Sequence, residues 1–251
     1  MASGCMGDRL CRRSRLLQSV ITLAAVFGLL LSVVGCTEVG PKPGPTSDRL
    51  ASSAGASLAI DFAQETGIPS SGFTTVERGR NVFPFIVRDG QLTHGMSVGK
   101  NAASYLLTDL TPEHVTRIGA TVNLSSDADG TFALLVGDGP VPADETEPAP
   151  NAAVHFVADS TGWSFAIWEA GGSGQTVLDR GVYGGSFNRD DASFEVSLNG
   201  DTATVYLPDS TSTSVTDPRI QKFGGPWAVW ELFESSAGML PLGFRKIWAA
   251  G

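Results

Sequence analysis

The sequence of 251 residues is poor in cysteine, with only Cys5, Cys11 and Cys36 present. Because none follows residue 36, a domain built from the rest of the chain has no disulfide bond to stabilise it. Positive charge is scarce too, since 17 Lys and Arg face 26 Asp and Glu and give a formal net charge of −9. This balance argues against nucleic acid as a partner. After Cys36 no stretch keeps a helical period for three turns, which argues against a helical fold.

The longest apolar run covers 16–36 and follows an arginine-rich segment. A cationic head, an apolar middle and small residues at the end are the parts of an export signal. The run ends in Val33-Val34-Gly35-Cys36, which resembles a bacterial lipobox and implies that Cys36 carries lipid. We therefore predict a signal peptide over 1–35, an extracytoplasmic location in the cell envelope and a membrane anchor at Cys36. The alternative is a retained membrane helix, since the run approaches the roughly 20 residues that span a bilayer.

Beyond the anchor, the sequence predicts a linker and one domain. Residues 36–57 are rich in Pro, Gly, Ser and Ala, so we expect a flexible linker there. Over 58–251, short runs of alternating apolar residues are separated by Gly, Asp, Asn and Pro, which predicts antiparallel strands. The expected strands cover 82–87, 115–124, 131–136, 152–158, 163–169, 176–182, 192–198, 202–207, 226–233 and 242–248.

The strongest local signal is Asn199-Gly200, a dipeptide typical of a two-residue hairpin loop. Such a loop would place Leu198 opposite Asp201 and Val196 opposite Ala203. Apolar residues would then meet on one face of the hairpin and polar residues on the other, while a slip of one residue would mix the two sets. We expect one face of this hairpin in the core.

The order of these elements resembles the concanavalin A-like lectin/glucanase superfamily, which includes the laminin G-like modules. The resemblance extends over about 58–250, and it is one of pattern, not of a diagnostic motif. It is carried by 83–92, by the hairpin that ends in Leu207-Pro208-Asp209, and by 226–231 and 242–248. It implies an all-β fold, an antiparallel two-sheet jelly-roll sandwich in which a concave sheet face often binds sugars.

Aromatic residues in the second half of the chain suggest a ligand platform, because the apolar C–H face of a sugar ring stacks on indole. Trp168 lies on the strand face opposite Trp163, Phe165 and Ile167. The leading hypothesis is an exported, non-catalytic protein that binds a glycan or another envelope component. The alternative is that these aromatic residues belong to the core or to sheet edges. The predicted ligand contacts are Trp168, Glu169, Asn188, Arg189, Tyr206 and Trp230.

The sequence is also compatible with two other functions. Glu169 and Glu231 each follow a tryptophan in a predicted strand, and a glycoside hydrolase needs two carboxyl groups about 5–10 Å apart. No E-x-D-x-E-like strand motif accompanies them, and the favoured alternative is two strand-end carboxylates hydrogen-bonded to neighbours such as Arg180 or Arg245. The third hypothesis is a structural or protein-interaction module of the envelope.

Several short motifs are weaker. Gly95-Met96-Ser97-Val98-Gly99 matches G-x-S-x-G, but that nucleophile motif needs a parallel sheet around it. Asp127-Ala128-Asp129-Gly130 could offer oxygens to calcium, although a hairpin turn explains it better. His94, His114 and His155 are far apart and have no short-spaced ligand partner, so we predict no metal site and no cofactor.

Overall fold

The computed structural model describes residues 51–78, 84–94, 102–109, 114–125, 129–142, 152–169, 174–234 and 242–251. The predicted signal peptide, Cys36 and the first part of the linker lie outside these residues, as do the 95–99 motif, Asp127 and the acidic segment 143–150. Within the described residues, no helix has the length and apolar character needed to cross a membrane.

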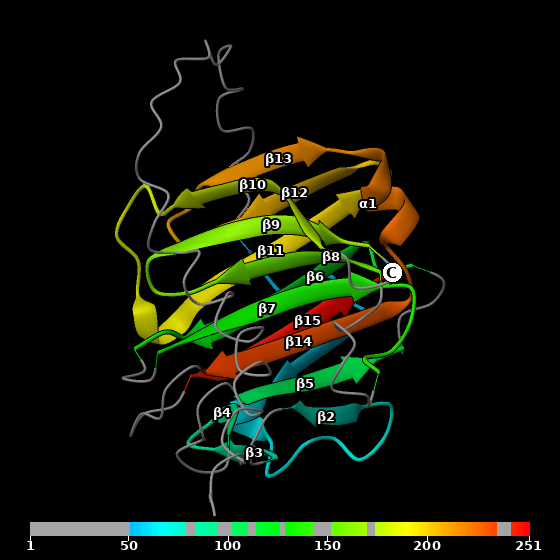
Figure 1. Cartoon of the computed structure of the whole chain (residues 1–251). Coiled ribbons are helices and arrows are strands. Elements are labelled where there is room, and N and C mark those ends of the chain that lie inside the picture. The colour runs from blue at the N-terminus through cyan, green and yellow to red at the C-terminus, as the bar shows by residue number, and fades with distance from the viewer. Residues whose placement is uncertain are drawn as a thin grey trace, which may run out of the picture. The chain divides into compact units, whose positions relative to one another are not determined.

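One layer of the domain is a sheet of eight strands (Figure 1). From one edge to the other its strands are β13 (Ser212–Thr216), β12 (Thr202–Tyr206), β11 (Ala192–Asn199), β6 (Arg117–Asn123), β15 (Gly243–Ala250), β4 (Gln91–His94) and β3 (Phe85–Arg88). Strand β1 (Leu58–Asp61) also pairs with β15, farther along that strand than β4.

The second layer is a sheet of seven strands. Its order is β10 (Gln175–Val182), β9 (Gly162–Trp168), β8 (Ala153–Ala158), β7 (Gly130–Gly137), β14 (Trp227–Glu234), β5 (Ala102–Thr108) and β2 (Thr74–Arg78). The described pairings in both sheets are antiparallel. The short helix α1 (Pro218–Phe223) packs against strands of both sheets. The predicted all-β, two-sheet jelly-roll sandwich is confirmed.

Each of the ten segments predicted as strands overlaps a strand of the structure. Five strands have no predicted counterpart, namely β1, β2, β4, β5 and β13. The described 3-10 turns are η1 (Phe62–Gln64) and η2 (Arg189–Asp191).

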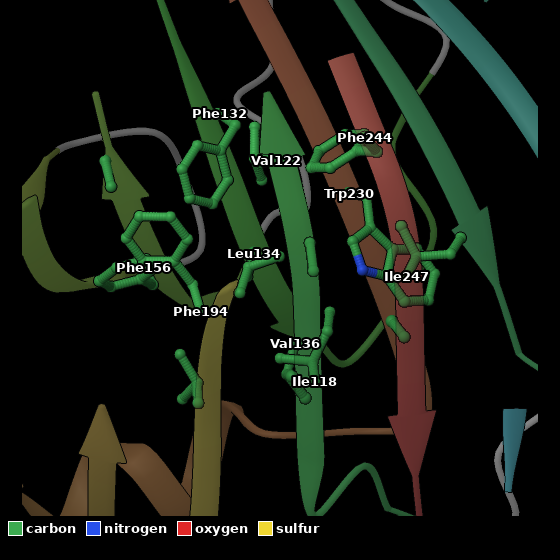
Figure 2. Packing of buried hydrophobic residues seen from close by; sticks show 14 of the residues in the cluster. Ile118, Val122, Phe132, Leu134, Val136, Phe156, Phe194, Trp230, Phe244 and Ile247 are labelled. Carbon is green, nitrogen blue, oxygen red and sulfur yellow. The ribbon is translucent and has the colours of Figure 1, made fainter. Parts of the chain in front are cut away.

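The hydrophobic core lies between the two sheets (Figure 2). The ring centroid of Phe132, on β7, lies 4.8 Å from that of Phe194 and 6.1 Å from that of Phe244, both on the opposite sheet. Trp230 is fully buried in the same layer, and its Nε1 donates a hydrogen bond of 3.0 Å to the carbonyl oxygen of Gly119. A buried indole needs such a partner for its N–H, so Trp230 joins the two sheets by packing and by a hydrogen bond.

The hairpin of β11 and β12 has the predicted faces, but the predicted register is wrong. Asn199 pairs with Thr202 and Val196 pairs with Val205, so the loop consists of Gly200 and Asp201. Gly200 has a φ of +59°, while Asp201 is not left-handed. This pattern is typical of a type II′ turn, which takes glycine at its first central position. Because each partner moves by two residues, the same side chains still face the core.

On the outer face of the eight-stranded sheet, Trp248 lies directly over Gly119, where a Cβ atom would come 2.2 Å from Cε2 of the indole. Its Nε1 donates to Oε2 of Glu195 at 3.0 Å. Arg117 binds both carboxylate oxygens of Glu195 and donates to the carbonyl oxygen of Ser52 at 2.8 Å. The chain that precedes β1 is therefore held against this face around Glu195.

Candidate functional site

The outer face of the seven-stranded sheet carries a group of buried polar side chains. Glu231, on β14, pairs with Tyr105 on β5 and with Ala133 on β7, and Ala133 pairs in turn with Val157 on β8. The side chains of paired residues lie on the same face of a sheet. Because the preceding residue, Trp230, points into the core, Glu231 points outward.

His155, on β8, approaches Glu231 across the intervening strand β7. Its Nε2 lies 3.9 Å from Oε2 of Glu231. Ala133, the β7 residue directly opposite Glu231, has only a methyl group and leaves room for the two longer side chains. Both are largely buried, with 10% of the His155 side chain and 15% of the Glu231 side chain exposed. The separation exceeds the range of a hydrogen bond, which is about 2.7–3.2 Å, so the two groups face one another without bonding.

Trp168 fixes the tautomer of His155. Its Nε1 donates to Nδ1 of His155 at 2.6 Å, and an indole N–H can only donate. The amide nitrogen of Gln175 lies 3.0 Å from the same ring nitrogen. Nδ1 is therefore the acceptor, and the proton of the neutral ring is on Nε2, which faces Glu231. Among the described residues, Nε2 has no hydrogen-bond partner.

The environment keeps His155 neutral and makes Glu231 titrate near neutral pH. Burial lowers the pKa of His155 to about 3. Burial raises the pKa of Glu231 to about 7, although a hydrogen bond with Tyr105 and the positive charge of Arg78 act in the opposite direction. The guanidinium carbon of Arg78 lies 5.6 Å from the centre of the Tyr105 ring, and its Nη2 donates to the carbonyl oxygen of Pro142 at 2.6 Å.

Around this polar group the outer face of the sheet is apolar. The buried apolar side chains there include Leu107, Leu135, Val141 and Val229. Trp227 and Phe233 are partly buried against them. The site thus offers an N–H donor and a carboxyl group in an apolar and aromatic setting. Such an arrangement fits a ligand that has both apolar faces and hydroxyl groups.

Glu169 is predicted from the sequence to bind a ligand or to act in catalysis. It follows β9, and its partner is an arginine, whereas Glu231 faces His155. Its Oε1 accepts a hydrogen bond of 2.8 Å from Nη1 of Arg219, on α1. Arg219 also binds Asp217, the residue that caps α1, at 2.8 Å. The glutamate does form an ion pair, but with Arg219 and not with the expected Arg180 or Arg245. A hydrolase that uses Glu169 would have to break this contact.

The structure does not bring the three predicted platform aromatics together. Trp168 lies at the site on the seven-stranded sheet, and Trp230 is fully buried in the core. Tyr206 is on β12 of the eight-stranded sheet, directly opposite Glu195. Asn188 precedes η2 and Arg189 is its first residue. Both are exposed, and η2 packs against β6. Ligand binding by these residues away from the site stays a prediction.

Sequence reasoning missed His155, Tyr105 and Arg78 as members of the site. A histidine at an outward position of an otherwise apolar strand, Ala153–Ala158, is a signal that could have pointed to His155. Its partner is far away in the sequence, however, and only the pairing of three strands brings the two together.

No family model matches this sequence, and no curated protein matches it. Solved structures match in fold. The carbohydrate recognition domain of Emp47p has a TM-score of 0.54 at 12% identity, over 84% of this chain and 100% of that chain. The fold is that of the concanavalin A-like lectins and glucanases. SCLam, a non-specific endo-β-1,3(4)-glucanase from family GH16, has a TM-score of 0.54 at 9% identity, over 82% of this chain and 93% of that chain. The endo-β-1,3-glucanase from Pyrococcus furiosus has a TM-score of 0.53 at 11% identity, over 77% of this chain and 93% of that chain.

Proposed function

We propose that this domain binds a carbohydrate, without catalysis, on the outer face of the seven-stranded sheet at His155, Glu231 and Trp168. The observation that carries the proposal is the buried Nε2–H of His155, which faces the Glu231 carboxyl group at 3.9 Å and has no partner among the described residues. A buried donor without a partner costs about 1–3 kcal/mol, and a ligand that accepts from it recovers that energy. The fold, shared with a lectin domain and with glucanases, supports a carbohydrate as the ligand class.

Trp168 supplies the apolar part of this recognition. Its ring meets the imidazole of His155 edge-on, with an interplanar angle of 60° and centroids 5.7 Å apart. The imidazole therefore does not stack on the indole face. That face is the kind of surface on which the C–H groups of a sugar ring pack.

A glycan array probed with the purified full chain in detergent tests this proposal. We expect wild-type protein to bind a subset of glycans, and His155→Phe and Trp168→Ala to lose that binding by at least tenfold. His114→Phe is the matched control, because His114 is exposed. Circular dichroism shows that each variant is folded. Absence of binding to any glycan, or equal binding by His155→Phe and wild type, would overturn the proposal and favour a structural or protein-interaction role.

We also propose that the protein is exported and held at the membrane by lipid on Cys36. This proposal rests on the sequence of 1–36, with its basic head, apolar run and terminal Val33-Val34-Gly35-Cys36. Metabolic labelling with an alkyne fatty acid should modify wild type and leave Cys36→Ala unlabelled. Label of equal intensity on Cys36→Ala would refute it, and an unlabelled wild type that stays in the membrane fraction would favour a retained helix.

A further inference from the structure

We infer that one hydroxyl group of the ligand bridges His155 and Glu231, and that the site therefore favours a glycan with a hydroxyl at that position over an analogue with a carboxylate or an ammonium group there. The inference rests on the proposed function, and it names the ligand class and the pH response of the same site.

The separation of the two groups allows one oxygen atom that lies beside them to bond to both. Nε2 of His155 and Oε2 of Glu231 are 3.9 Å apart. A hydroxyl oxygen bonded to both would lie about 2.9 Å from the nitrogen and about 2.7 Å from the carboxylate oxygen. These three lengths close a triangle whose angle at the hydroxyl oxygen is about 90°, which one lone pair and one O–H bond of the same oxygen can serve.

The two protein groups also fix the chemistry of the bridging group. Nε2 carries the proton, because Trp168 donates to the other ring nitrogen, so the ligand must accept there. The ionised Glu231 carboxylate can only accept, so the ligand must donate there. A hydroxyl does both. An ammonium group has no lone pair for His155, while a carboxylate has no proton for Glu231 and is repelled by its charge.

The pH response follows from the groups that face Glu231. Tyr105 approaches from β5, Arg78 from β2 and His155 from β8, and β7 contributes only Ala133. His155 stays neutral because its pKa is about 3. As the pH falls through about 7, Glu231 becomes protonated, and the charge-assisted hydrogen bond from the ligand hydroxyl is lost. We therefore expect binding to weaken by about tenfold between pH 8.5 and 5.5.

The test uses one array that carries neutral, uronate-containing and amino-sugar glycans, probed at pH 8.5 with full-length wild type, Glu231→Gln and the control His114→Phe. Stronger binding of a neutral glycan than of its uronate and amino-sugar analogues supports the inference. Equal binding of uronate or amino-sugar glycans overturns the charge selection but leaves the proposed function standing. No binding to any glycan overturns both.

A second arm measures the pH response with the neutral glycan that gives the strongest array signal. Wild type should bind it about tenfold more weakly at pH 5.5 than at 8.5. Glu231→Gln keeps an acceptor but does not titrate, so its affinity should be equal at both values. A wild-type affinity independent of pH would overturn the bridging role of Glu231. Nitrogen NMR of the ligand-free protein checks the donor directly, because a proton on Nδ1 instead of Nε2 would contradict the bridge.

Discussion

His155 and Glu231 act on stability in opposite directions as the pH changes. Burial lowers the pKa of His155 from 6.5 to about 3. Between these values the unfolded chain binds a proton that the folded chain does not, so the free energy of unfolding rises by about 1.4 kcal/mol per pH unit. Burial raises the pKa of Glu231 from 4.5 to about 7. In that range the folded chain holds the extra proton, and the free energy of unfolding falls by about 1.4 kcal/mol per unit.

The two ranges overlap between pH 4.5 and 6.5, so the two contributions cancel there in the wild-type protein. Glu231→Gln removes the falling contribution, and its stability relative to wild type should rise by about 3 kcal/mol across the overlap. His155→Phe removes the rising contribution, and its stability should fall by about 3 kcal/mol relative to wild type. His114→Phe, at an exposed position, should follow wild type throughout.

Urea unfolding at pH 4.5, 5.5 and 6.5, followed by tryptophan fluorescence, measures these differences. Asp61 and Asp209 have a lowered pKa, so their stabilising effect is lost only as the pH falls below about 4. They are also common to all four proteins and drop out of the difference between variant and wild type. Curves for Glu231→Gln and His155→Phe that run parallel to wild type would refute the buried environment on which the site depends.

Three further substitutions separate steric, backbone and core effects. Gly119→Ala should lower stability by about 2–3 kcal/mol, since its Cβ would lie 2.2 Å from the Trp248 ring, and thermal unfolding would show a clear drop in Tm. Gly200→Ala should cost about 1–3 kcal/mol, because the site is open but φ is +59° at the first central position of the type II′ turn; no loss by urea titration would contradict that turn. Trp230→Phe should cost about 2–4 kcal/mol through lost volume and the lost hydrogen bond to the Gly119 carbonyl. A near-wild-type urea midpoint would mean that Trp230 does not bridge the sheets.

The fold could be predicted from the sequence because most strands have one face in the core. In β11, Phe194 and Val196 are buried in the core while Ser193 and Ser197 face outward, and such alternation is visible without a structure. Strand β5 could not be recognised in this way, because both of its faces are apolar. Leu106 packs in the core and Leu107 in the apolar outer cluster, so consecutive apolar residues hide the period of two.

The site could not be predicted in the same way, because its geometry depends on strand order. Trp168 was correctly assigned to the face opposite the core, since the alternation of β9 is clear. Nothing in the sequence indicates that β8 and β14 flank β7, and only this arrangement places His155 beside Glu231. The prediction for Trp230 failed for another reason. Both faces of β14 are apolar, which hides the alternation, and Trp230 points toward Gly119 in the core.

The composition of this outer face argues that the His155–Glu231 pair is kept for a ligand and not for folding. Its neighbours Leu107, Leu135 and Val229 are apolar, and apolar residues at the two polar positions would extend that cluster. Replacing buried polar or charged pairs by well-packed apolar residues is often neutral or stabilising. The pair instead leaves the Nε2–H of His155 unbonded among the described residues and forces both groups away from their ordinary pKa values. Shifted pKa values in a cluster of this kind are typical of functional sites. On our proposal, the energy lost in the free protein is recovered when a ligand hydroxyl group bonds to both His155 and Glu231.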